Sequence, residues 1–311
     1  MKPLPYNNRI KVVYIGGSGR CGSTLLSLLL SEHQSFFECG EIKNLWERGV
    51  LEDRKCACGD SFSTCQYWSQ VMQSVISETD PDIASRMNAV TSQATRYRNY
   101  FKLRKASRSG HGYIPENFLA TLARLYRSIS NTSEGKIIVD SSKLAAYARL
   151  LMMLPDVDLF YINLVRDPRA VVYSWQKKMK YEPGAGREMD RFGAARAALI
   201  WKFAYMTAAD VLKEVPGVTV RYEDLAGDTS GTMQAILSEI NRWLSDSLPV
   251  ANIENLSWGS TSHSLSGNPL RFRKGETIKL DANWKANFGG MGALATTLLC
   301  KSEIQRYGYA G

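Results

Sequence analysis

Short apolar runs alternate along the chain with stretches whose apolar positions have helical spacing. The runs cover residues 11–15, 136–140, 159–165 and 218–222, and they are rich in β-branched residues. Strands of this kind, alternating with helices, are typical of a parallel sheet covered on both faces. The pattern therefore predicts an α/β fold with a central parallel sheet flanked by helices.

Two other regions depart from this alternation. Residues 66–133 have helical periodicity and lie between the first two strands, so we interpret them as an insertion that could shape a ligand pocket. Residues 256–288 contain several glycines and few periodic apolar positions, which indicates a long C-terminal loop. Loops of that length in a compact domain are usually functional or disordered. We expect one domain over residues 1–311, with a helical insertion at about 66–133.

Composition and charge exclude only a few classes of protein. The 311 residues are 44% hydrophobic, which is enough for a full core, and the net charge of +9 should attract anions. Residues 96–108 are basic with almost no acid, which favours a solvated helix face, with an anion or membrane-surface patch as the alternative. No run approaches the ~18 apolar residues of a transmembrane segment. The polar start of the chain does not resemble a signal peptide, so we expect a cytoplasmic protein.

Three of the six cysteines are close in sequence. Cys56, Cys58 and Cys65 form a C-x-C pair and a third cysteine seven residues on, and Cys39 or a histidine could complete a zinc site. Structural zinc sites more often use C-x-x-C pairs. A disulfide is a second possibility, but a reducing compartment favours free thiols. From the sequence we therefore expect no metal.

A glycine-rich segment follows the first strand. Residues 17–24 read GSGRCGST, which fits a P-loop-like G-x-x-x-x-G followed by hydroxyl residues at a helix start. Glycines let backbone N–H groups surround an anion, and the helix N-terminus adds partial positive charge. Ser23 stands where a nucleotide P-loop has lysine, which disfavours ATP or GTP hydrolysis. Arg20 supplies a cation instead, as suits a single 5′-phosphate-type anion.

These residues resemble the sulfotransferase family that uses 3′-phosphoadenosine-5′-phosphosulfate (PAPS). Its 5′-phosphosulfate loop reads [KR]-x-G-[ST]-T, and residues 20–24 read RCGST, more like the carbohydrate, tyrosylprotein and bacterial branches than the cytosolic animal branch. The resemblance implies that the donor contacts Gly19, Arg20, Cys21, Gly22, Ser23 and Thr24.

A second motif supports the resemblance. The family binds the 3′-phosphate with an arginine at a strand end and a serine eight residues on, and Arg166 and Ser174 have this spacing. An arginine fork and a hydroxyl two helical turns along can reach one phosphate. The alternative is that Arg166 pairs with Asp167 or caps a helix, with Ser174 as a buried polar residue.

Two further segments complete the resemblance. Residues 271–275 read RFRKG and are similar to the family's C-terminal segment that covers the 3′-phosphate, which implies donor contacts for Arg273, Lys274 and Gly275. Asn283 replaces the glycine that the family has before the tryptophan. Tyr222 begins a YEDL element in which the family's tyrosine touches adenine.

The resemblance implies a sulfotransferase that moves the sulfuryl group of PAPS to a hydroxyl or amine of a small-molecule or glycan acceptor. The product 3′-phosphoadenosine-5′-phosphate (PAP) would be released, and no metal would be required. We expect no nucleic-acid partner, and a monomer or homodimer. The alternatives are a P-loop kinase or NTPase and a non-catalytic anion-binding protein.

The acceptor's proton requires a base. Glu41 matches the position of a catalytic glutamate in the carbohydrate and tyrosylprotein branches, and Lys143 resembles a lysine that assists the leaving group there. Either residue could instead be solvated at the surface. His263 is a reserve base because histidine titrates near neutral pH. Asp140 and His111 are weaker candidates.

Overall fold

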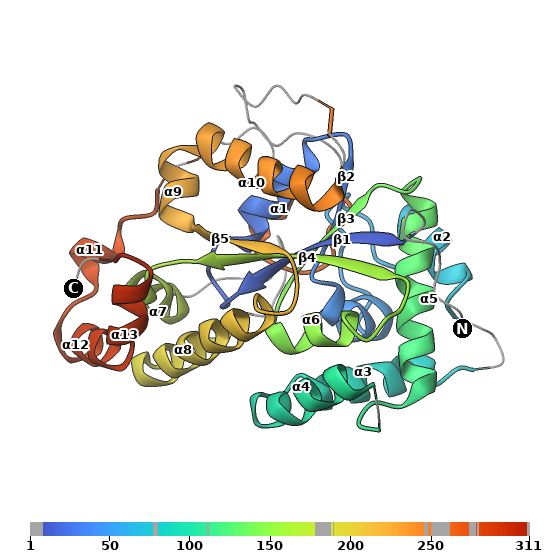
Figure 1. The fold of residues 1–311 in the computed structure, drawn as a ribbon, viewed down its shortest axis with the longest axis horizontal. Coiled ribbons are helices and arrows are strands. Elements are labelled where there is room, and N and C mark those ends of the chain that lie inside the picture. Colours follow the sequence, from blue (N-terminus) through green and yellow to red (C-terminus); the bar gives the residue numbers. More distant parts are fainter. Residues whose placement is uncertain are drawn as a thin grey trace.

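A five-stranded parallel sheet forms the centre of the molecule (Figure 1). The structure, a computed structural model, describes residues 9–76, 80–110, 112–177, 188, 190–245, 248–249, 262–273, 278 and 280–309. The strand order is β2-β3-β1-β4-β5, and every neighbouring pair is parallel. The predicted α/β fold is confirmed. The strands are β1 Ile10–Gly17, β2 Phe36–Gly40, β3 Ile137–Lys143, β4 Val157–Val165 and β5 Gly217–Arg221.

Helices cover both faces of this sheet. Successive residues of a strand point to opposite faces. Val12 and Tyr14 accordingly belong to the core under α5, α6 and α8, whereas Val13 and Ile15 belong to the core under α1, α9 and α10. The α-helices are α1 Ser23–Ser31, α2 Gln66–Gln73, α3 Ile83–Ala94, α4 Tyr100–Ser109, α5 Glu116–Thr132, α6 Ala145–Leu151, α7 Pro168–Gln176, α8 Ala194–Val211, α9 Tyr222–Gly227, α10 Thr229–Leu244, α11 Trp284–Asn287, α12 Gly290–Leu299 and α13 Lys301–Arg306.

Strand β2 is absent from the pattern predicted by the sequence. It is short, and Glu38 interrupts its apolar run. The Glu38 carboxylate is buried, where it accepts hydrogen bonds from the Ser27 hydroxyl at 3.2 Å and the Ser262 hydroxyl at 2.6 Å. A buried, satisfied carboxylate gives no local hydrophobic signal, so this strand was missed.

The region between β2 and β3 is largely helical. It contains η2 Ile42–Asn44, the π-helical turn η3 Leu45–Leu51, helices α2 to α5 and the short turn η4 Tyr97–Asn99. Helix α2 packs against α5, and α4 packs against α6. The described part of the C-terminal loop contains only the turn η5 Pro269–Phe272 and α11. None of the described helices is both long and apolar enough to cross a membrane.

Candidate active site

The glycine-rich loop joins β1 to α1 at the carboxyl edge of the sheet. Gly17 and Gly22 have φ angles of 148° and 98°, which favour glycine. A Cβ on Gly22 would lie 2.4 Å from the Tyr222 ring, and a Cβ on Gly19 would lie 2.5 Å from Trp175. The N-cap residue of α1 is Gly22, which has no side chain to cap the helix, so the first N–H groups of α1 point toward the loop as an anion site requires.

Arg20 lies at the centre of this loop. Its φ of 71° is unusual for a residue with a side chain. Its guanidinium lies over the Trp175 ring at 4.9 Å, and its carbonyl accepts a hydrogen bond from Arg166 Nη1 at 3.2 Å. The fold thus brings together two arginines that are 146 residues apart in the sequence.

Arg166 follows β4 and is buried. Its guanidinium lies over the Tyr222 ring at 4.3 Å and donates from Nη2 to Asp281 Oδ2 at 3.2 Å. Asp167 does not take this role, because Asp167 caps α7 and pairs with Arg169 instead. Arg166 Nε is buried and has no hydrogen-bond partner among the described residues. A carboxylate therefore lies where the sequence predicts a phosphate to bind.

The other predicted donor residues are placed as follows. Ser174 lies half-buried in α7, and Tyr222 begins α9 against Gly22. Arg273 ends the η5 turn, where its N–H donates to the Leu270 carbonyl at 3.0 Å. Lys274 and Gly275 lie outside the described residues.

Glu41 and Lys143 meet at the carboxyl ends of the neighbouring strands β2 and β3. Lys143 Nζ donates a hydrogen bond to Glu41 Oε1 and another to the Ser141 carbonyl at 3.2 Å. The side chains are 14% and 15% exposed, respectively, so both remain accessible. Asn44 donates to Glu41 Oε2 at 2.6 Å, and Arg48 lies 4.0 Å from the same oxygen.

These neighbours keep Glu41 ionised. Burial alone would raise the pKa of Glu41, but Lys143 and Arg48 outweigh it and lower the pKa below the ordinary value of 4.5. Glu41 is therefore a carboxylate near neutral pH, as a general base must be. Lys143 itself has a φ of 69°, and backbone strain of this kind is common at functional sites.

A segment near the C-terminus covers this edge of the sheet. Leu265 forms a parallel bridge with Gly40, and the Leu265 carbonyl accepts from the Glu41 N–H at 2.9 Å. The Asn268 N–H donates to Thr24 Oγ1 at 3.2 Å. Ser266 accepts hydrogen bonds from Asn44 and Arg48. The segment thus connects the phosphate loop to the surroundings of Glu41.

His263 and Asp140 contact other groups. His263 Nδ1 lies 3.3 Å from the Cys65 sulfur, and burial lowers the pKa of His263. Asp140 is fully buried and accepts hydrogen bonds from Tyr126 and Ser142, both at 2.5 Å. Burial raises the pKa of Asp140 to about 6. His111 lies outside the described residues.

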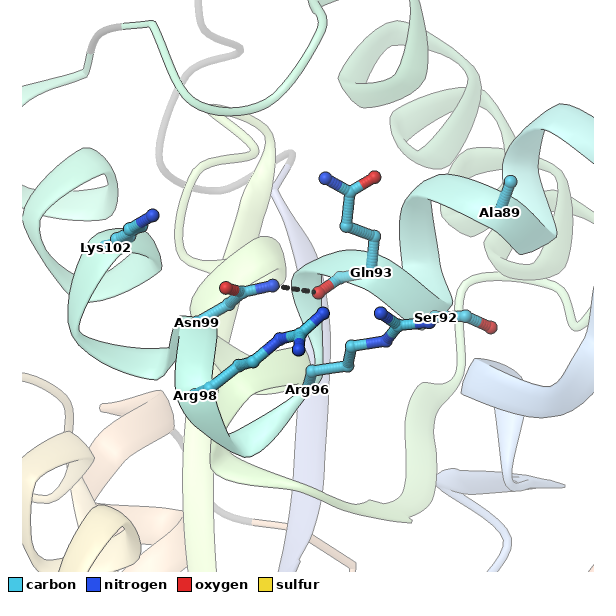
Figure 2. A pocket seen from close by; sticks show the side chains of 7 residues that line it. All are labelled: Ala89, Ser92, Gln93, Arg96, Arg98, Asn99 and Lys102. Atoms are coloured by element: carbon cyan, nitrogen blue, oxygen red, sulfur yellow. Dashed lines mark hydrogen bonds between the residues drawn. The ribbon is translucent and has the colours of Figure 1, made fainter.

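The basic stretch divides into two parts. Arg104 and Arg108 on α4 pair with Asp210 and Glu214. Arg96 and Arg98 lie at the turn between α3 and α4, where Figure 2 shows them side by side. They line a hollow of about 650 Å³. No carboxylate in the described part of the chain pairs with either arginine.

A second hollow joins these arginines to sequence neighbours of the candidate base. It has a volume of about 580 Å³ and includes Arg96, Arg98 and Thr95 together with Lys43 and Leu144. Lys43 follows Glu41 by two residues, and Leu144 follows Lys143 directly. Glu41 and Lys143 do not line this basic hollow, but Lys43, which does, is close enough to Glu41 for their charges to interact.

Asn44, Arg48 and Asp281 were not among the residues expected from sequence. Asn44 and Arg48 lie on the turns directly after Glu41. Their short distance from Glu41 in the sequence is the only local signal that could have pointed to them. Asp281 is 115 residues from Arg166, and no local pattern connects them.

Comparison with known proteins agrees with this architecture. Residues 13–244 match the sequence profile of the sulfotransferase family. The chain therefore belongs to the sulfotransferase family. A search of curated protein sequences found no match.

Two solved structures have a similar fold. One is the sulfotransferase domain from the curacin biosynthetic pathway, with a TM-score of 0.52 and 19% identity over 99% of each chain. The other is the sulfotransferase domain from the Synechococcus PCC 7002 olefin synthase, with a TM-score of 0.53 and 18% identity. The match covers 100% of this chain and 98% of the olefin synthase domain. At these identities the comparisons support the fold.

Proposed function

We propose that this sulfotransferase uses PAPS as donor and sulfates a hydroxyl or amine of a small-molecule or glycan acceptor. The observation that carries the proposal is the arrangement along one sheet edge. The Arg20 loop lies beside Arg166, and the Glu41 and Lys143 pair lies on the adjacent strands. Ligands of parallel sheets bind at this edge.

The residues present fit the donor. The close approach at Gly19 and Gly22 leaves no space for a Cβ, and the first N–H groups of α1 suit the 5′-phosphate end. Arg166 has a buried Nε without a partner among the described residues, as suits an arginine that binds the 3′-phosphate. Tyr222 lies between these two groups and offers a ring face for adenine.

The chemistry requires charge stabilisation and one proton transfer. PAPS supplies the sulfuryl group, whose bond to the 5′-phosphate oxygen breaks as the acceptor's oxygen or nitrogen bonds to sulfur, leaving PAP. Arg20 and Lys143 stabilise the oxygen charge of the transition state. Glu41, ionised and partly exposed, takes the acceptor's proton.

The rival functions lack a corresponding feature. A kinase or NTPase needs the P-loop lysine, and this chain has Ser23 in that position. The family profile that matches this chain is that of sulfotransferases. A nucleic-acid-binding protein would show a recognised motif, and none was found in the sequence. The cytoplasmic location and the monomeric or homodimeric state stay predictions.

The basic hollow indicates an acceptor with an anionic group. Arg96 and Arg98 line the same hollow as Lys43, and the charge of Lys43 interacts with that of the proposed base Glu41. A carboxylate, phosphate or sulfate on the acceptor would pair with these cations. Replacing both arginines with alanine should raise KM for anionic acceptors about tenfold, as expected for charge-assisted contacts, and leave neutral acceptors unchanged. Lys105→Ala, on the exposed face of α4, is the matched control.

Two experiments test the donor assignment. PAP should raise the melting temperature without magnesium, because ligands of the native state stabilise it, whereas ATP should not. Radiolabelled PAPS incubated with the protein and extracts of the producing cell should give a labelled product. Stabilisation by magnesium-ATP alone, with no labelled product, would contradict the proposal.

A further inference from the structure

Three cysteines and a histidine converge outside the candidate active site. Cys56, Cys58 and Cys65 come from the segment between η3 and α2, and His263 comes from the C-terminal segment, about two hundred residues later. The three sulfurs and one ring nitrogen all lie within 4.8 Å of one another. The Cys58 and Cys65 sulfurs are 3.7 Å apart. His263 Nδ1 lies 3.8 Å from the Cys56 sulfur and 3.3 Å from the Cys65 sulfur.

These separations fit the edges of a tetrahedral zinc site. With Zn–S near 2.3 Å and Zn–N near 2.0 Å, tetrahedral geometry places two sulfurs about 3.8 Å apart and a sulfur and nitrogen about 3.5 Å apart. A disulfide would instead need a sulfur separation of about 2.05 Å. We propose that Cys56, Cys58, Cys65 and His263 bind a structural zinc ion. The sequence favours free thiols at these positions, whereas their arrangement in the fold points to a metal.

The local backbone explains how a C-x-C pair serves such a site. The Cys56 N–H donates to the Asp60 carbonyl at 2.9 Å, and the Gly59 N–H donates to the Cys56 carbonyl at 3.0 Å. Gly59 has a φ of 104°, and Lys55 and Ser61 close the turn as an antiparallel bridge. This tight turn brings the Cys56 and Cys58 sulfurs together, within 4.8 Å of the Cys65 and His263 ligand atoms.

The other two ligands are held by helix α2. Cys65 is the N-cap residue of α2, so the start of the helix fixes its position. The His263 ring stacks on the Tyr67 ring, with the ring centroids 5.1 Å apart. The backbone carbonyl of His263 accepts a hydrogen bond from Trp68 Nε1 at 2.9 Å. Both aromatic residues belong to α2, so one helix positions both Cys65 and His263.

Four protein ligands define the role of the ion. A zinc ion with four protein ligands has no open position for substrate, so the site is structural rather than catalytic. Cys56 and Cys65 are buried and Cys58 is partly exposed, which gives the metal an entry side. Binding releases the thiol protons and involves no change of oxidation state.

The ion would stabilise the segment that covers the active site. In this segment Leu265 bridges to Gly40 and accepts from Glu41, and Asn268 donates to Thr24, as described above. Zinc bound to His263 ties this segment to the loop that follows η3. Loss of zinc should therefore loosen the cover over Glu41 and the phosphate loop.

Zinc content provides a test that does not depend on activity or on PAPS. Full-length protein produced with zinc and purified under reducing conditions should contain about one zinc ion per chain. Cys65→Ser and His263→Ala should each lose most of it. Cys300→Ser is the matched control, because Cys300 is a buried thiol in a separate core cluster and should not affect zinc content.

A second measurement uses only the wild-type protein, so it remains possible if the variants fail to fold. A chelator that strips zinc from the wild-type protein should lower its melting temperature, and zinc should restore it. Cobalt(II) should then give the visible absorption of a tetrahedral site with thiolate ligands. Reduced wild-type protein without bound metal, or a Cys58–Cys65 disulfide found by mass spectrometry in place of zinc, would overturn the proposal.

Discussion

Lys143 Nζ donates a hydrogen bond to Glu41 Oε1 where the neighbouring strands β3 and β2 end. The ammonium of Lys143 is the largest influence that keeps Glu41 ionised against the effect of burial. This pairing gives the lysine two roles in the proposed mechanism. It lowers the pKa of the base, and it offers a cation to the oxygens that carry charge in the transition state.

Replacing Lys143 should change the pH dependence of turnover. In Lys143→Met, the lysine charge no longer offsets the effect of burial on Glu41, so the pKa of Glu41 should rise. Because the base must be ionised, the acid limb of the kcat/KM profile should move to higher pH. The profile of Lys136→Met, which removes an exposed lysine just before β3, should match the wild type. An unshifted acid limb in Lys143→Met would contradict the pairing.

Arg166→Ala should selectively weaken recognition of the 3′-phosphate. A charge-assisted contact contributes about 1.5–3 kcal/mol, so PAP affinity should fall by roughly ten- to a hundredfold by calorimetry. The affinity for an analogue without the 3′-phosphate should hardly change. Equal losses for both ligands would show that Arg166 only supports the fold around Tyr222.

Asp281→Asn should have the opposite effect. Asp281 pairs with Arg166 at 3.2 Å, so a 3′-phosphate must compete with its carboxylate. Burial acts to raise the pKa of Asp281, but Arg166 and Lys177 lower it, so the competing charge persists at neutral pH. The side chain is 35% exposed, so the pair contributes up to about 1 kcal/mol. PAP should therefore bind up to about fivefold tighter. Asp224→Asn, a more exposed carboxylate near Arg221, should leave the affinity unchanged.

The sequence predicted the sheet better than it predicted the contacts around the site. Four strands have enough apolar residues to be recognised locally, whereas the buried carboxylate of Glu38 obscured β2. The glycine loop could be located because its function depends on consecutive residues. The pairing of Arg166 with Asp281, and of Cys65 with His263, depends on segments more than a hundred residues apart. Local patterns do not encode such long-range contacts.

Asp140 should make stability depend on pH. Burial raises the pKa of this carboxyl from 3.8 to about 6. Between these values the folded protein keeps a proton that the unfolded chain releases, so the free energy of unfolding should fall as pH rises. A shift of about two pH units corresponds to ~3 kcal/mol.

The comparison between wild type and Asp140→Asn isolates this contribution. The stability of the wild type relative to the variant should fall by ~3 kcal/mol between about pH 3 and pH 7 in urea titrations. Asp82→Asn, at an exposed site, should show no such pH-dependent difference. A difference between wild type and Asp140→Asn that is constant over this range would show that Asp140 does not titrate there.

Glu41→Gln tests the base itself. The amide keeps the shape of the side chain and can still accept from Asn44, but it cannot take the acceptor's proton. Loss of a general base typically lowers the rate by about 10²–10⁴-fold. Turnover should fall by that order, while PAP affinity stays within about twofold because Glu41 serves the acceptor. Glu47→Gln, an exposed glutamate on η3, is the matched control. Retained turnover in Glu41→Gln would refute its role as the general base.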